Sequence, residues 1–289
     1  MVRSYQRARI ASLAGALTLA LGLVATLAPP ARAAFPGGVP DRARLSLGGL
    51  FAGLTTSAQL SLQGGTLGTT LDGERDLGLK PHQSVLRLEG RLRMAGPLSL
   101  DAGWVRFDRK ADRVLSAPIA FGELTFSAGS QVSSRLDTDL PYAALRVDLV
   151  HTPLVRAGPS LGASIVTLNT TMSANAGVLV AGNTIPASGA RSYKQTAPVP
   201  LVGLAGEVSP VARLECGGYG RWFDLRFDQF SGSMTEWGIR AGYFPLARVG
   251  VGVGYEYTRV QVRKLVIDPV DASLDYTVRG LRLSGEFAF

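Results

Sequence analysis

The sequence is poor in residues that commonly carry chemistry, with one cysteine, Cys216, and two histidines, His82 and His151, among 289 residues. A single cysteine excludes an internal disulfide. Its distance from the N-terminal apolar run also excludes the lipid-modified cysteine of a lipoprotein. We therefore expect Cys216 to serve as a small apolar residue on a lipid-facing strand.

Long apolar runs are scarce as well. Only 10–28 approaches the ~20 residues that a membrane helix needs. This run follows three arginines and precedes Pro29-Pro30 and Ala31-Arg32-Ala33, the small-x-small pattern of a signal peptidase site. We predict a cleaved signal peptide over residues 1–33 and one mature domain over 34–289. An uncleaved anchor is the alternative, which the richness of the run in Ala and Gly disfavours.

Clustered basic charge is also missing. The formal net charge is +8, and it becomes +4 once the four arginines of residues 1–33 are removed. The remaining positive charges alternate with acidic ones, whereas a nucleic-acid partner requires basic residues gathered on one face. We therefore expect no nucleic-acid partner.

Strict alternation of apolar and polar residues is what the chain does have. It is clearest over 86–94, 249–257 and 281–289. A period of two places the two sets on opposite faces of a β-strand. Segments of ~9–11 residues, joined in turn by short turns and long polar loops, are typical of transmembrane β-barrels.

Four short turns contain a proline followed by an apolar residue, at Pro97, Pro153, Pro210 and Pro245. Five loops separate them, at about 63–82, 109–134, 172–194, 229–233 and 264–272. This order predicts an all-β, transmembrane, antiparallel up-and-down β-barrel of ten strands with both termini on the periplasmic side. The predicted strands are 43–54, 84–95, 98–108, 138–150, 157–171, 196–208, 211–227, 234–244, 247–262 and 273–289. Eight strands are one alternative, and twelve are another if 119–132 forms a membrane hairpin.

The orientation of the faces distinguishes a membrane barrel from a soluble one. In a membrane barrel the apolar face meets lipid, aromatic residues gather at the interfaces, and charges face the lumen. We predict interfacial aromatic residues near the periplasmic ends (Tyr243, Phe244, Phe287 and Phe289) and near the other ends (Trp104, Trp222, Phe223 and Trp237). We also predict a luminal charge network of Arg87, Glu89, Arg91, Asp101, Arg146, Asp148, Arg213, Glu215, Arg240, Glu256, Arg282 and Glu286. A soluble barrel would reverse this orientation.

The last strand alternates apolar residues and ends on an aromatic one, with Leu281, Leu283, Phe287 and Phe289. It resembles the assembly signal of Gram-negative outer-membrane β-barrels, although Gly285 stands where a bulky residue is usual. The resemblance implies the cell outer membrane as location. It also implies insertion by the barrel-assembly machinery and contact with outer-membrane lipid and lipopolysaccharide.

The first long loop contains Asp72-x-Glu74-x-Asp76-Leu-Gly-Leu79. This segment resembles the acidic D-x-E-x-D-L-G-L loop of an uncharacterised group of outer-membrane barrels, which brings no activity with it. Carboxylates at alternate positions are hard oxygen ligands suited to calcium. The glycine and the late glutamate of a calcium loop are not at the required offsets, however, so we favour a solvated acidic loop.

Catalytic candidates are few. His151 is predicted on the periplasmic side, and His82 ends the first external loop, where Asp137, Asp139 or Ser84 could accompany it. A narrow ten-stranded lumen filled with charges is expected to be nearly shut. We therefore expect a loop-displaying scaffold or a narrow small-solute pore, with no cofactor. The alternative is an outer-membrane protease or lipid-modifying hydrolase with its site at the extracellular rim near His82.

Overall fold

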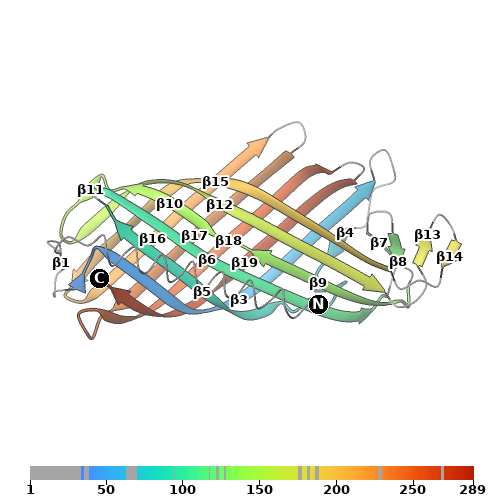
Figure 1. Ribbon diagram of the computed structural model, residues 1–289, viewed down its shortest axis with the longest axis horizontal. Helices are drawn as coiled ribbons and strands as arrows, with labels where there is room; N and C mark the ends of the chain where they lie inside the picture. Colours follow the sequence, from blue (N-terminus) through green and yellow to red (C-terminus); the bar gives the residue numbers. More distant parts are fainter. Residues whose placement is uncertain are drawn as a thin grey trace, which may run out of the picture.

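The computed structural model describes residues 34–35, 39–62, 70–94, 96–116, 118–121, 124–126, 128–174, 178–180, 183–185, 189–226, 230–267 and 270–289. The predicted signal peptide, 1–33, lies outside the described residues and remains a prediction. Most of the described chain is β-strand, wound into one elongated barrel (Figure 1). None of the described residues belongs to a helix of the length and apolarity that a bilayer crossing requires.

Antiparallel strands close into a ring of ten positions, as predicted, because the last strand pairs with the first along its whole length. β9 and β10 share one position, since both pair with β6 and β12 in a continuous register that is interrupted only at Leu140 and Pro141. The ring consists of β3 (Ala43–Leu62), β5 (His82–Arg93), β6 (Leu98–Val114), β9 (Gln131–Asp139) with β10 (Tyr142–Val147), β12 (Val155–Ala174), β15 (Gly189–Val211), β16 (Leu214–Arg226), β17 (Phe230–Tyr243), β18 (Val249–Ile267) and β19 (Val270–Ala288).

Short strands outside the ring lie near its two ends. β1 (Ala34–Phe35) pairs with β2 (Val39–Pro40), β4 (Thr70–Asp72) pairs with β3, and β11 (Val150–His151) pairs with β12. A separate four-stranded sheet contains β7 (Ile119–Phe121), β8 (Leu124–Phe126), β13 (Val178–Val180) and β14 (Asn183–Ile185). The hairpin β7–β8 therefore does not add strands to the ring, and the twelve-stranded alternative is wrong.

The strands extend further on the long-loop side than the sequence predicts. β3 continues to Leu62 instead of residue 54, and the hairpin β12–β15 is paired from Val155 and Val208 up to Ala174 and Gly189. Several stretches that were predicted as loops are therefore strand. In Figure 1, β3 and the hairpin β12–β15 extend well past the middle of the barrel toward the long-loop end.

The outer face changes character along the strands. Toward the short-turn end it is apolar, and Leu86 and Leu283 are each 54% exposed. A row of aromatic residues follows, formed by Trp237, Tyr255 and Tyr257; the Trp237 ring stacks on Tyr257 with 5.8 Å between ring centroids and lies 5.6 Å from that of Tyr255. Beyond this row the outward residues are polar, such as Thr235 and Arg259. Because interfacial aromatic residues mark the edge of the hydrocarbon layer, this row marks the upper boundary of a lipid-facing belt.

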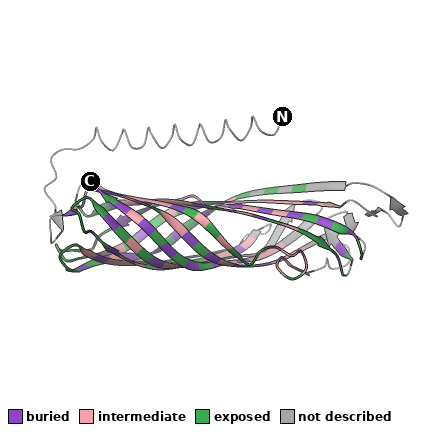
Figure 2. Ribbon diagram, turned by 90° about the horizontal axis from the view of Figure 1, so that it is seen from below, coloured by how far each residue is buried: buried purple, intermediate pink, exposed green. Residues whose placement is uncertain are grey.

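The inner face changes in the opposite sense. Beside the belt it is charged, with Arg87 and Arg282 only 4% and 3% exposed. Beyond the aromatic row it becomes apolar and forms one buried core, which includes Leu50, Leu54, Phe107, Leu136, Val166, Leu201, Met234, Val260 and Val278. The predicted orientation, charges inward and apolar residues outward, is confirmed for the belt, and buried and exposed positions alternate along its strands (Figure 2).

The ring is split on one side above the belt. β15 and β16 are paired only as far as Val202 and Trp222, and beyond that point the described part of β15 pairs with β12 alone. Pro198 and Pro200 lie where the ladder to β16 would continue, and proline has no N–H to donate. The hairpins β12–β15 and β16–β17 diverge accordingly (Figure 1).

Candidate functional site

Among the described residues, the lumen of the belt contains equal numbers of arginines and carboxylates. Nine arginines face it, namely Arg44, Arg87, Arg91, Arg93, Arg146, Arg156, Arg221, Arg240 and Arg282. Nine carboxylates face it, namely Asp41, Glu89, Asp101, Asp148, Glu207, Glu215, Glu236, Glu256 and Glu286. Opposite charges in equal number, arranged in contact, offset much of the cost of removing each from water.

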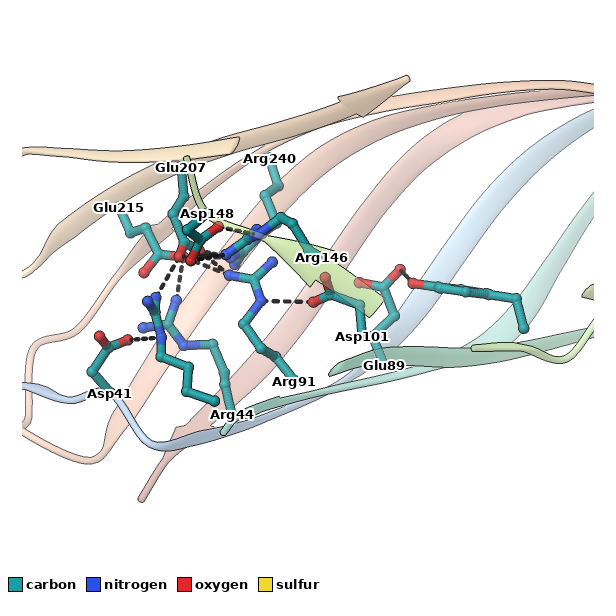
Figure 3. Close-up of polar contacts among 12 residues, drawn as sticks. Asp41, Arg44, Glu89, Arg91, Asp101, Arg146, Asp148, Glu207, Glu215 and Arg240 are labelled. Atoms are coloured by element: carbon teal, nitrogen blue, oxygen red, sulfur yellow. Dashed lines mark hydrogen bonds and ion pairs between the residues drawn. The ribbon is translucent and has the colours of Figure 1, made fainter. Parts of the chain in front are cut away.

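Glu207 on β15 is the centre of the lower half of this luminal charge network. It contacts Arg91 and Arg93 of β5, and its Oε1 accepts a hydrogen bond from Arg146 Nη2 at 3.1 Å. Arg240 Nη2 lies 3.6 Å from its Oε2. The Glu207 side chain is fully buried, so its charge is balanced by arginines from three other strands (Figure 3).

Further ion pairs close the lumen at its short-turn end. Asp41, just before β3, lies 2.7 Å from Arg93 Nε and 2.9 Å from Arg156 Nη2. Glu215 contacts both Arg44 and Arg240. Because these partners come from strands all round the ring, the network connects opposite walls of the barrel at this level.

The upper half of the network combines ion pairs with aromatic rings. Arg87 Nη2 lies 2.9 Å from Glu89 Oε1, and Arg282 Nη1 lies 2.9 Å from Glu256 Oε1. The Arg221 guanidinium is 4.6 Å from the ring centroid of Tyr142, a cation–π distance. A Cβ on Gly103 would clash with that ring, so the glycine leaves room for Tyr142 to lie against the wall.

Little free space remains in the network. The cavity among Arg91, Asp101, Tyr142, Arg221 and their neighbours has a volume of about 60 Å³, enough for a few waters. A second cavity of about 20 Å³ lies where the charged region meets the apolar core. Both cavities are far smaller than a solute-wide channel would require.

The first external loop closes the upper barrel. Its segment 70–81, here called the plug segment, buries Leu71, Leu77 and Leu79 in the apolar core. Glu74 fixes it to the wall, because Oε1 lies 2.6 Å from Arg109 Nη1 and Oε2 accepts the Thr56 N–H at 2.9 Å.

The other two acidic residues of the plug segment shape its turn. Asp72 Oδ1 accepts the N–H groups of Glu74 and Arg75, and Asp76 Oδ2 accepts the Asp72 N–H at 2.9 Å. Burial raises the pKa of Asp76, but this hydrogen bond and the Arg75 guanidinium together hold it below its usual value. Among the described residues no three His, Cys, Asp or Glu side chains converge as metal ligands. The expectation of a solvated acidic loop is wrong for Glu74 and the three leucines, which are folded into the barrel, whereas Asp72 and Asp76 remain partly exposed.

The structure places the predicted luminal residues in the lumen with one exception. Arg213 is exposed in the turn between β15 and β16, with a left-handed φ of 66°. Arg213 is two residues from the luminal Glu215, so strict alternation would place both side chains on the same face. The turn before β16 breaks this alternation. Two aromatic predictions are also wrong, because Phe244 is buried beneath the Arg44 guanidinium, and Phe223 packs on the apolar core.

Sequence reasoning missed seven luminal charges: Asp41, Arg44, Arg93, Arg156, Glu207, Arg221 and Glu236. Most lie at the same alternate positions of their strands as luminal residues that were predicted. Extending the alternation along each whole strand would therefore have found them. Asp41 is the exception, because it precedes the first strand of the ring.

The histidines lie apart from the network. His82 and Ser84 are both exposed at the start of β5, and His151 is exposed in β11 at the short-turn end. Asp139 accepts a hydrogen bond from the Trp104 indole at 2.6 Å, and Asp137 accepts one from Arg135 at 2.9 Å. Both candidate aspartates of a His82-centred site are thus engaged elsewhere, whereas Ser84 lies on the same exposed face of β5 as His82.

The residues of the predicted assembly signal, Leu281, Leu283, Phe287 and Phe289, are all exposed along β19 and at its end, within the apolar belt. Cys216 lies half-buried among the lipid-facing residues of β16, as expected. β19 forms the closing ladder with β3.

The chain matches no family model and no curated protein. Among solved structures it is similar to the outer membrane protease OmpT from Escherichia coli, with 14% identity, a TM-score of 0.58, and coverage of 86% of this chain and 97% of that one. OprG from Pseudomonas aeruginosa is another neighbour (11% identity, TM-score 0.35, coverage 88% and 100%), and so is the Pseudomonas putida toluene transporter TodX (9%, 0.35, 87% and 91%).

The likeness to OmpT shows the outer-membrane β-barrel fold. Together with the apolar belt and its aromatic border, this fold locates the chain in the bacterial outer membrane.

Proposed function

We propose that this outer-membrane β-barrel is a closed scaffold that carries a water-exposed upper barrel and its loops above the membrane. One observation carries the proposal: over the described residues the charge network, the apolar core and the plug segment occupy the lumen, and the cavities among them are small. A closed lumen leaves the upper wall and the loops as the surfaces that can interact with other molecules.

The polar outer wall supports this role. Arg259 forms a bidentate pair with Asp275, and Arg263 Nη2 lies 2.7 Å from Asp224, all above the aromatic row. Interstrand pairs of this kind keep the wall soluble and hold its shape where no lipid supports it. The upper barrel therefore resembles a soluble barrel raised on a membrane-spanning base.

Planar-bilayer recording tests the scaffold against a narrow pore. We expect the wild-type protein, folded and inserted, to show no steady conductance. A steady conductance that changes in Glu89→Gln or Arg91→Gln would establish the pore and overturn the scaffold. Gel mobility before and after heating shows that each preparation is folded, and a wide porin in the same bilayer shows that channels are detectable.

The terminal strand carries the second part of the proposal, insertion by the barrel-assembly machinery into a membrane of phospholipid and lipopolysaccharide. Deleting Phe289 is expected to slow the appearance of the heat-modifiable folded form in cells. The exposed Leu246→Ala, in a periplasmic turn, is the control. Equal assembly of both variants would show that the terminal aromatic residue is not the recognition element.

A further inference from the structure

At the periplasmic rim of the barrel, the exposed charged side chains among the described residues are arginines. Arg213 and Arg248 are exposed there, whereas the described carboxylates nearest this end, Asp41, Asp148 and Glu286, are buried in the lumen. The two arginines occupy equivalent places in the turns Pro210-Val-Ala-Arg213 and Pro245-Leu-Ala-Arg248. This repeated motif plays no part in the scaffold.

Arg213 is held in place at this rim. Its Nη1 donates a hydrogen bond to the Pro245 carbonyl at 2.9 Å, and its own carbonyl accepts the Phe244 N–H at 2.9 Å. The residue therefore links two neighbouring turns. Only one of its five N–H donors is used in that hydrogen bond, so the others remain available to an anion.

Directly above this rim the lipid-facing wall is hollowed. A hollow of about 730 Å³ extends from β12 to β19, and nearly all of its exposed lining is apolar. It exists because three adjoining positions, Ala157, Gly206 and Gly218, have little or no side chain. Cys216, which also lines it, is three residues from Arg213, roughly 10 Å along a strand.

We propose that the hollow and the two arginines form a docking site for one glycerophospholipid of the periplasmic leaflet. An acyl chain would lie in the hollow and the phosphate would lie between Arg213 and Arg248. The inference rests on the membrane-spanning base of the proposed scaffold. The hollow is continuous with the lipid-facing belt, so a lipid chain is its natural occupant, and the rim charge complements a phosphate.

Native mass spectrometry of the folded, full barrel in detergent tests the site, with phosphatidylglycerol as the probe. We expect one retained lipid per barrel. Arg213→Gln with Arg248→Gln should weaken retention by roughly fivefold per arginine, and Ala241→Phe, which fills the hollow, should also weaken it. Arg259→Gln on the upper wall and Ala143→Phe on the outer face of β10 are the matched controls.

Equal retention in the rim variants and their controls would overturn the proposal, because bound lipid would then be adventitious. A dimer of the barrel that is lost in Ala241→Phe would also overturn the proposal, because the hollow would then be occupied by a second copy of the barrel. Heat-modifiable mobility confirms that each variant is folded. The scaffold is judged separately by its conductance, so its failure is distinguishable from failure of the lipid site.

Discussion

The Glu74 carboxylate lies 2.6 Å from the Arg109 guanidinium, and this buried pair attaches the first external loop to the barrel wall. Arg109 also contacts the Thr56 hydroxyl and lies 5.7 Å from the ring centroid of Tyr276. The loop is thus anchored by a charge on the inner face, where the surrounding residues are otherwise mostly apolar. Such a pair is costly to break, because the remaining charge stays buried.

Replacing Glu74 with Gln is expected to loosen the plug segment, because Arg109 would lose its only carboxylate partner among the described residues. Trypsin should then cut after Arg75 faster than in the wild type, while the membrane-spanning base stays intact. Mass spectrometry of timed digests measures the rate. Asp112→Asn, an exposed change on β6, is the control, and equal rates in all three proteins would show that the pair does not hold the loop.

The plug segment should also respond to acid. The pKa of Asp76 is held below its usual value of 3.8, so the carboxylate contributes stability that is fully present above that pH. This contribution is lost as the pH falls through the lowered pKa. We expect the carboxyl resonance of Asp76, followed by NMR, to titrate with a midpoint below 3.8. A midpoint at or above that value would contradict the hydrogen-bonding role, and Arg75→Gln, which removes a guanidinium that lowers this pKa, is expected to raise the midpoint.

Removing Glu207 should destabilise the barrel more than removing any exposed carboxylate. In Glu207→Ala, the buried arginines Arg91, Arg93 and Arg146 lose a shared partner, which is expected to cost about 3–5 kcal/mol. Unfolding by urea in lipid vesicles, followed by tryptophan fluorescence, measures the loss. Asp112→Ala, an exposed change on β6, should leave the unfolding midpoint unchanged, and similar midpoints for both variants would refute the central role of Glu207.

The split between β15 and β16 predicts an alternating pattern of amide exchange. The backbone N–H of Ile165 in β12 donates to the Pro141 carbonyl, away from β15. The N–H groups of the even-numbered residues of β12 therefore point toward β15, where their partners are the odd-numbered residues. The N–H groups of Ser192, Lys194 and Thr196 therefore face the open side. We expect these three to exchange much faster than those of Tyr193, Gln195 and Ala197. Uniform protection would mean that the two hairpins are paired in solution.

Alternation in the sequence predicted the ten strand positions because the belt imposes it, with lipid on one side and charges on the other. Above the aromatic row this contrast is reversed or weakened. In β15, Lys194 and Thr196 face outward beside Pro198 and Pro200, and the stretch has the composition of a loop. The upper strands were missed because of this loop-like composition. Their pairing partners also lie in distant segments of the sequence.

The sequence predicted that charged residues face the lumen, but it did not predict which ion pairs they form. Parity identified Arg87, Glu89 and Arg282 but could not show that Glu207 is shared among several arginines, since that depends on how ten strands close. Arg213 was misplaced because a left-handed turn residue breaks the phase of the alternation. The role of Glu74 was likewise hidden, because its partner Arg109 is 35 residues away in the chain.

All the positive charges of the luminal charge network belong to arginines, and no described lysine side chain takes part in it. The described lysine side chains, Lys80, Lys110 and Lys194, are all exposed on the long-loop side. An amine-reactive reagent that cannot cross the membrane would consequently modify these lysines from outside an intact cell and leave the ionic interior untouched. The native chain thus carries built-in chemical markers of its topology, and no introduced residue is needed to read which end faces the medium.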